Sequence, residues 1–117
     1  MSRLISLLLS MAFLASACTP SLPFSDARTI VTDGNRLLLD HPDGFIDKAS
    51  WSPAIAALNP KHVWSAPEGL YICTREFFVD QQGFFVPRPG VVVTPSPTGD
   101  PSYAPLRDGL FTYHIRG

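Results

Sequence analysis

Proline interrupts this chain so often that it limits what the chain can fold into. Twelve prolines and eight glycines occur among 117 residues. A proline ends a helix, because it lacks a backbone N–H and clashes with the preceding turn, and within sheets it stays at the edges. Glycine marks turns. The spacing therefore predicts short strands joined by turns, with no long helix.

An Asp-Gly pair near the start of the expected domain indicates a β-hairpin. Residues 28–32 and 35–39, rich in β-branched and apolar side chains, flank Asp33-Gly34. Asp-Gly between two such runs is a strong hairpin pattern, because both residues tolerate the positive φ of a tight turn. We expect the first two strands there. Further strands are predicted at 45–46, 62–65, 70–80, 84–86, 91–94 and 110–116.

One short helix and one long loop complete the expected fold. Ser52 is a suitable N-cap and Pro53 a suitable first helical residue, and Asn59-Pro60 ends the helix. Residues 95–108 contain four prolines and are predicted to be a loop. The expected fold class is mainly β: a small antiparallel β-sandwich or partly open barrel of six to seven strands with one short helix, formed by residues 28–117 as a single domain.

The first seventeen residues have the features of an export signal. Arg3 provides a positive charge, and an eleven-residue apolar stretch runs from Leu4 to Leu14. That stretch is too short to span roughly 30 Å of hydrocarbon as a helix, but it suits the apolar region of a signal peptide. Small residues at 15–17 fit a signal peptidase site. We therefore expect residues 1–17 to be removed.

Residues 15–18, Ala-Ser-Ala-Cys, also resemble the lipobox of bacterial lipoproteins, although Ala15 stands where leucine is commoner. The resemblance implies that Cys18 becomes the acylated N-terminus and that residues 18–27 form a flexible spacer. Two or more acyl chains hold a protein stably at a membrane, since each buried CH₂ contributes about 0.8 kcal/mol. Thr19, not Asp, follows the cysteine, which implies a lipid-anchored place at the outer membrane, facing the periplasm.

The cysteine count leaves two alternatives for Cys73, the second of two cysteines. If Cys18 is acylated, Cys73 has no partner within the chain and should be buried or pair with another chain. If Cys18 is free, an 18–73 disulfide would contribute roughly 4 kcal/mol on the chain-entropy model. The apolar run 70–73 favours burial.

Charge and motif content exclude several classes of partner. The chain has nine basic and ten acidic residues, a net charge of −1, and its basic residues are spread singly. A nucleic-acid groove or an anionic-lipid patch requires clustered positive charge. We therefore expect no nucleic-acid partner. The sequence also lacks a recognisable motif for a cofactor or a small-molecule substrate.

Polar residues form no recognisable catalytic or metal-binding motif. Residues 40–47 hold three aspartates and a histidine, but their spacing fits a solvated turn better than a calcium loop. The three histidines stand 21 and 52 residues apart, so a short zinc-binding spacing is missing. The one nucleophilic arrangement open to the chain is a thiol–imidazole pair, if His62 or His114 lies near Cys73.

Aromatic residues exceed what one small core obviously requires. Phe77-Phe78 and Phe84-Phe85 fall on the two arms of one predicted hairpin. Because a strand sends adjacent side chains to opposite faces, either both faces of the sheet are covered or one row of rings is exposed to a partner. We therefore take Phe77, Phe78, Phe84 and Phe85 as candidate partner-binding residues.

Together these patterns predict a lipid-anchored envelope protein that acts as a protein-interaction or structural module and not as an enzyme. Its expected partners are the membrane, through the N-terminal lipid, and another envelope protein. One alternative is a small secreted inhibitor or immunity protein. Another is an envelope hydrolase or metal-binding protein, for which the candidate residues are His41, Asp43, His62, Cys73 and His114.

Overall fold

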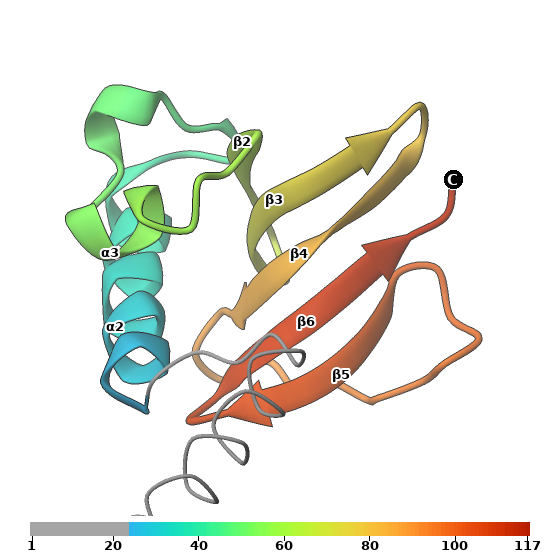
Figure 1. Cartoon of the computed structure of the whole chain (residues 1–117). Coiled ribbons are helices and arrows are strands. Elements are labelled where there is room, and N and C mark those ends of the chain that lie inside the picture. Colours follow the sequence, from blue (N-terminus) through green and yellow to red (C-terminus); the bar gives the residue numbers. More distant parts are fainter. Residues whose placement is uncertain (1–23) are drawn as a thin grey trace, which may run out of the picture.

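The computed structural model describes residues 24–117, which form one open β-sheet with helices against one face (Figure 1). Six strands in this part of the chain pair antiparallel in the order β1-β2-β3-β4-β6-β5. The predicted mainly β, antiparallel class with six strands is confirmed. Within residues 24–117 the strands form a single sheet that is not closed into a barrel and has no second sheet packed on it, and a helix of 17 residues occurs where no long helix was expected. The elements are α2 (Phe24–Asp40), β1 (Gly44–Phe45), a 3₁₀ turn (Lys48–Ser50), α3 (Pro53–Ala56), β2 (His62–Ala66), β3 (Gly69–Phe77), β4 (Asp80–Pro87), β5 (Ser102–Arg107) and β6 (Leu110–Ile115).

Residues 28–39 form part of helix α2, so the hairpin predicted around Asp33-Gly34 is wrong. The helix starts at Phe24, inside the range expected for the spacer. Its buried residues recur at the three- and four-residue spacing of one helix face: Ala27, Ile30, Gly34, Leu37 and Leu38. None of the helices among residues 24–117 is long and apolar enough to cross a membrane.

Gly34 allows helix α2 to lie close against strand β4. A Cβ atom at this position would lie 3.0 Å from Cγ2 of Val86, tighter than ordinary van der Waals contact. The glycine that suggests a turn therefore serves helix–sheet packing. Burial of the helix face outweighs the roughly 1 kcal/mol by which glycine disfavours a helix.

The sheet has two different faces, and each carries its own cluster of buried side chains. The face toward α2 and α3 holds an aliphatic core: Ala27, Ile30, Leu37, Leu38, Ile46, Ile55, Val63, Leu70, Ile72, Val86 and Leu110. The opposite face holds an aromatic cluster of Tyr71, Phe85 and Tyr113 with Ala66, against which Trp64 and Tyr103 pack. Both faces of this single sheet therefore bury apolar side chains.

The short helix and most of the later strands agree with the sequence predictions. Ser52 caps α3, because its Oγ accepts a hydrogen bond from the backbone N–H of Ile55 at 3.3 Å. Residues 62–66, 69–77, 80–87 and 110–115 are strands. The strand predicted over 70–80 ends early, because the turn of this hairpin lies at residues 78–79 and residues 80–83 already belong to β4. At the β5–β6 turn, Asp108 and Gly109 both have positive φ, 52° and 83°, as a tight Asp-Gly hairpin turn requires.

Two predictions in the proline-rich region are wrong. Residues 91–94 form no strand, and Val93 instead packs against the aromatic cluster. Prolines stand on both sides of this segment, and the backbone N–H of Val91 donates to the carbonyl oxygen of Arg88 in a turn instead of to a neighbouring strand. Conversely, residues 102–107 of the predicted loop form strand β5, which contains Pro105. Strand β5 tolerates the proline because it lies at the edge of the sheet.

Arg88 joins the end of helix α2 to the β2–β3 turn. Its guanidinium donates hydrogen bonds to the backbone carbonyl oxygens of Ala66 at 3.0 Å and Leu38 at 3.4 Å, and its Nε donates to Pro67 at 3.0 Å. Leu38 belongs to the last turn of the helix, whose carbonyls lack helical partners. One side chain therefore satisfies acceptors from two elements and fixes them together.

We predict that Gly34→Leu destabilises the protein by about 1–3 kcal/mol, although leucine favours helices more than glycine does. The added side chain would overlap Val86 and push α2 off the sheet. Urea unfolding followed by circular dichroism measures the change. Arg36→Leu, at an exposed position of the same helix, is the control and should change stability by less than about 0.5 kcal/mol. Equal effects of the two variants would contradict this packing.

Candidate functional site

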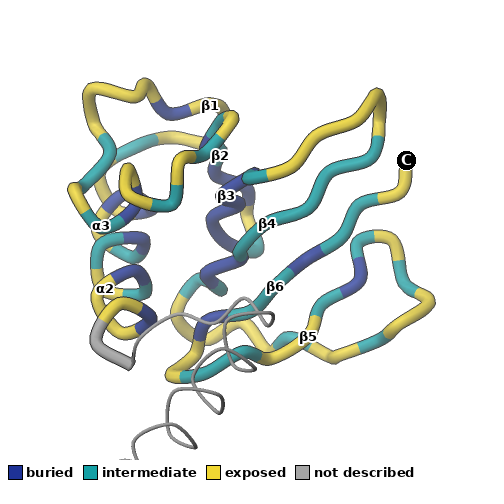
Figure 2. The backbone as a smooth tube through the Cα atoms, in the orientation of Figure 1, coloured by how far each residue is buried: buried dark blue, intermediate teal, exposed yellow. Residues whose placement is uncertain are grey.

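The β3–β4 hairpin ends in an exposed apolar tip, which we call the hairpin tip and define as Phe77, Phe78 and Val79. Their exposed fractions are 73%, 87% and 67%. The two phenyl rings meet edge to face with centroids 4.6 Å apart. Figure 2 shows that the outer part of this hairpin, along β3 and the turn, is exposed. The fold itself therefore does not bury these side chains.

The backbone of the hairpin tip is strained. Phe77 pairs with Asp80, so Phe78 and Val79 form a two-residue turn, and Phe78 has a φ of 55°. Glycine, asparagine and aspartate are the residues that normally occupy such a position, and a bulky side chain there is an outlier. The β5–β6 turn of the same sheet uses Asp108-Gly109. The tip therefore places a large ring where the backbone favours a small residue.

The four candidate phenylalanines divide between the hairpin tip and the two cores. Phe77 and Phe78 are exposed. Phe84 is half-buried and packs against the aliphatic core, whereas Phe85 is 1% exposed and belongs to the aromatic cluster. The adjacent pair in β4 thus points to opposite faces, as strand geometry requires.

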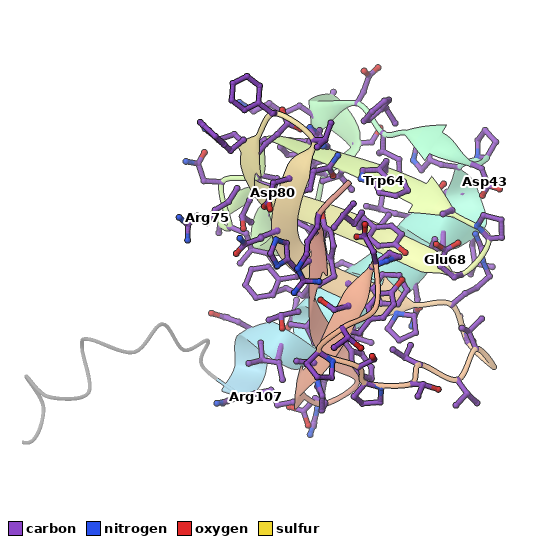
Figure 3. The ribbon with its side chains drawn as sticks, turned by 90° about the vertical axis from the view of Figure 1, so that its right-hand side faces the viewer. Asp43, Trp64, Glu68, Arg75, Asp80 and Arg107 are labelled. Carbon is purple, nitrogen blue, oxygen red and sulfur yellow. The ribbon has the colours of Figure 1, made fainter. Side chains whose placement is uncertain are left out.

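Tyr71 lies at the centre of the aromatic cluster, against which Trp64, labelled in Figure 3, also packs. Trp64 stacks on its ring at a centroid distance of 4.1 Å. The Tyr71 hydroxyl donates to Oε2 of Glu68 at 2.7 Å and lies 2.6 Å from the Tyr103 hydroxyl. Burial, followed by these two hydrogen bonds, raises the Tyr71 pKa far above its ordinary value. Tyr71 is therefore a neutral structural phenol.

Three potential metal ligands meet on this aromatic face, and we call them the thiol cluster: His62, Cys73 and Glu76. Their ligand atoms all lie within 4.8 Å of one another. His62 and Cys73 are paired across β2 and β3. His62 is therefore the histidine that lies near Cys73, as a thiol–imidazole pair would require. Cys73 is buried, as the apolar run 70–73 favours, and it forms no disulfide with any residue of the described range 24–117.

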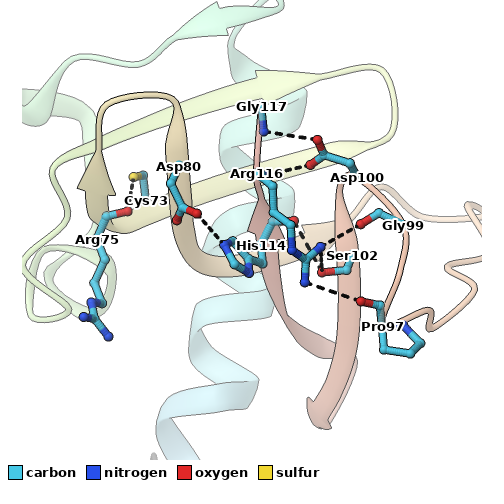
Figure 4. Close-up of polar contacts among 10 residues, drawn as sticks. All are labelled: Cys73, Arg75, Asp80, Pro97, Gly99, Asp100, Ser102, His114, Arg116 and Gly117. Carbon is cyan, nitrogen blue, oxygen red and sulfur yellow. Dashed lines mark hydrogen bonds and ion pairs between the residues drawn. The ribbon is translucent and has the colours of Figure 1, made fainter.

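The thiol of Cys73 is shielded from water and held in place by its neighbours. Its Sγ donates a hydrogen bond to the carbonyl oxygen of Arg75 at 3.4 Å (Figure 4). Burial raises the Cys73 pKa, while interaction with the Tyr113 hydroxyl lowers it to a smaller extent. A thiol in this state is a poor nucleophile, because the thiolate is the reactive form.

The other polar candidates lie apart from the thiol cluster. His114 pairs with Asp80, at 2.9 Å between Nε2 and Oδ2, and lies on the opposite face from Cys73. Asp43 forms an ion pair with Arg88 at 3.6 Å. His41 lies just after helix α2. The structure therefore brings together only His62 and Cys73 from that set.

The face that carries His114 also contains a cavity of about 660 Å³. It is lined by residues from β4, β5 and β6, including Phe84, Thr112 and His114. Arg116 also lines it, and its guanidinium donates to the carbonyl oxygens of Gly99 and Pro97 at 3.0 and 3.4 Å (Figure 4). The Arg116 guanidinium is therefore already hydrogen-bonded to backbone carbonyl groups of the protein.

Comparison with known proteins adds no family to this geometry: no family model, curated protein or solved structure matches the chain. Cys18, the predicted acylation site, lies outside the described residues.

Sequence reasoning missed Glu76, because a strand without a bulge would place it on the opposite face from Cys73. It also missed the left-handed backbone at Phe78.

We predict that Asp80→Asn lowers stability at neutral pH and that this loss disappears in acid. The hydrogen bond from His114, with smaller contributions from Gln82 and Arg116, holds the Asp80 pKa below its ordinary value. A carboxylate with a lowered folded-state pKa stabilises the fold above its ordinary pKa of about 3.9, and that contribution is lost as pH falls through the folded-state value.

Urea unfolding over a pH series tests this prediction. The difference between wild type and Asp80→Asn should shrink as the carboxylate of the wild type becomes protonated. Asp40→Asn removes an exposed carboxylate at the end of α2, away from His114, and is the control for the loss of one negative charge. A stability difference that stays constant down to acid pH would rule out the charged hydrogen bond as its cause.

Proposed function

We propose that this protein is a lipid-anchored envelope protein whose β domain binds another envelope protein through the hairpin tip. The observation that carries the proposal is the combination of exposure and strain at Phe78, with Phe77 beside it. Observed strain supports an inference toward function, because folding alone selects against it.

The hairpin tip lowers the stability of the fold through its strained backbone, and its exposed rings contribute little stabilisation in exchange. A residue held in the left-handed region costs on the order of 1–3 kcal/mol. Burying a phenylalanine side chain contributes about 1.5–3 kcal/mol, but Phe77 and Phe78 realise little of that here. A partner with an apolar pocket would bury both rings. Aromatic anchors inserted into pockets are the residues that dominate binding energy in protein interfaces.

The charges around the hairpin tip favour a protein partner over a lipid surface. Arg75 and Glu76 are exposed on β3 next to the tip, and Asp80 begins β4. Charges of both signs around an apolar centre are typical of the rim of a protein interface. A surface that binds anionic lipid would instead carry clustered positive charge.

The position of the hairpin tip also suits a chain tethered before helix α2. In Figures 1 and 3 the start of α2 and the β3–β4 turn lie at opposite ends of the molecule. If Cys18 is acylated and held at the outer membrane, only five residues separate it from Phe24. The tip would then face away from the anchored bilayer, toward the periplasm, where another envelope protein can reach it.

We predict that Phe78→Gly abolishes partner binding without destabilising the fold. Glycine relieves the strain at positive φ and removes the ring. Pull-down from detergent-solubilised envelopes, compared with wild type, should show at least a tenfold loss of the specific partner, while urea unfolding shows equal or higher stability. Phe77→Ser should lose binding as well.

Leu39→Ser is the matched control for this experiment. Leu39 is 85% exposed on helix α2, so its substitution removes a similar apolar surface away from the hairpin tip. It should retain the partner. If Phe78→Gly and Phe77→Ser recover every protein that wild type recovers, the tip is not the binding surface. If the unacylated Cys18→Ala variant binds lipid vesicles, and loses them when Phe77 and Phe78 are substituted, the tip binds lipid and the proposal is refuted.

We predict that Cys18→Ala releases the protein from the membrane fraction. Mass spectrometry of the wild-type N-terminus should show that the chain begins at an acylated Cys18. Washing envelopes with plain buffer should leave wild type bound and extract the variant. An unmodified thiol, or an 18–73 disulfide in a protein that washes free, would instead support a secreted inhibitor or immunity protein.

A further inference from the structure

We propose that the thiol cluster, formed by His62, Cys73 and Glu76, binds a divalent cation of the zinc type. The proposal is independent of the hairpin tip and of the lipid anchor. It rests on the convergence of one thiol, one imidazole and one carboxylate, whose ligand atoms lie within 4.8 Å of one another. These three groups are the ligands that zinc takes from proteins.

A β-bulge in β3 brings Glu76 to the face of Cys73. Cys73 pairs with Gly83 and Arg75 with Gln82, so Thr74 is an extra residue in the ladder. The insertion shifts the alternation by one, and Glu76 therefore points to the same face as Cys73, although the two are three residues apart. Bulges recur next to functional sites because they re-aim side chains in this way.

The distances are close to those of a tetrahedral site. His62 Nε2 and Glu76 Oε2 lie 3.3 Å apart. In tetrahedral zinc coordination, with bonds of about 2.0 to 2.3 Å, neighbouring ligand atoms lie about 3.3 to 3.6 Å from one another. The thiol therefore needs only a small displacement toward the other two groups. Three protein ligands leave the fourth position for water.

Two buried polar atoms next to the thiol lack a hydrogen-bond partner among the described residues: Nε2 of His62 and the hydroxyl of Tyr113. Nε2 lies within ion-pair distance of Glu76 but not in hydrogen-bond geometry. A cation would satisfy Nε2. Tyr113 pairs with Gly83, which has no side chain and pairs in turn with Cys73, and the Tyr113 hydroxyl would donate to the metal-bound thiolate.

The cluster is also oriented and reachable from solvent. The Phe45 ring meets the His62 imidazole edge-on at a centroid distance of 5.4 Å and restricts its rotation. The side chains of His62 and Glu76 are 24% and 41% exposed, whereas Cys73 is buried. An ion would therefore enter past the carboxylate and reach the sulfur last.

The test uses cobalt as a spectroscopic probe in the full-length chain in detergent, carrying Cys18→Ser so that Cys73 is its only thiol. Titration with Co²⁺ should give one equivalent of binding, with tetrahedral d–d bands and a thiolate-to-cobalt charge-transfer band that Zn²⁺ displaces. Zn²⁺ should also raise Tm. Absence of the charge-transfer band at a large excess of Co²⁺ would overturn the proposal.

Substitutions identify the ligands. Cys73→Ser should eliminate the charge-transfer band, and His62→Gln and Glu76→Gln should each weaken Co²⁺ binding at least tenfold. Glu76→Gln changes an exposed side chain, so its loss of binding cannot be attributed to misfolding. His41→Gln is the control for a histidine outside the cluster and should bind as wild type does. Unchanged affinity in both His62→Gln and Glu76→Gln would show that the site is elsewhere.

Discussion

The close contact between helix α2 and strand β4 at Gly34 determines how the rest of the molecule is arranged. Because Gly34 has no side chain, the helix approaches Val86 directly, and its buried face covers the aliphatic side of the sheet. Apolar burial of this kind is the main source of stability in a small domain. Arg88 then fixes the end of the helix to the β2–β3 turn.

The two faces of the sheet therefore provide two different environments. On the helix side, the core is aliphatic, and His114 and Asp80 meet at the margin of a cavity. On the other side, rings pack around Tyr71, and the thiol cluster lies beside them. The shared hairpin connects these features, because β3 carries Cys73 and Glu76 and ends at the hairpin tip. Binding at the tip and binding at the cluster would involve the same strand.

The sequence predicted those elements whose local chemistry agrees with their surroundings. Ser52 and Pro53 favour the start of a helix through local interactions, and Asp108-Gly109 forms the turn that it favours. The same dipeptide at 33–34 led to the wrong prediction of a turn. The turn preference of two residues contributes less free energy than the burial of a whole helix face. A helical spacing of Ala27, Ile30 and Gly34, within a stretch free of proline, is the pattern that indicates the helix.

The candidate sites were less predictable than the strands, for reasons that are also local. The paired phenylalanines in the sequence pointed to the hairpin tip. Which of the four rings are exposed depends on tertiary packing, which leaves Phe77 and Phe78 exposed and covers Phe84 and Phe85. His62 and Cys73 meet through strand register, which the sequence sets only weakly. The bulge at Thr74 has no distinctive residue in the sequence. Glu76 therefore could not be predicted as the third residue of the thiol cluster.

The strand order has a consequence for the way this chain reaches its final state. Strand β6 follows every other strand in the chain, yet it lies between β4 and β5 and pairs with both. A polypeptide that emerges with its amino end first, from a ribosome or a translocation channel, cannot complete its sheet until residues 110–115 are free. Until then β4 has an open edge and β5 has no neighbour, so the domain stays incompletely assembled throughout its passage.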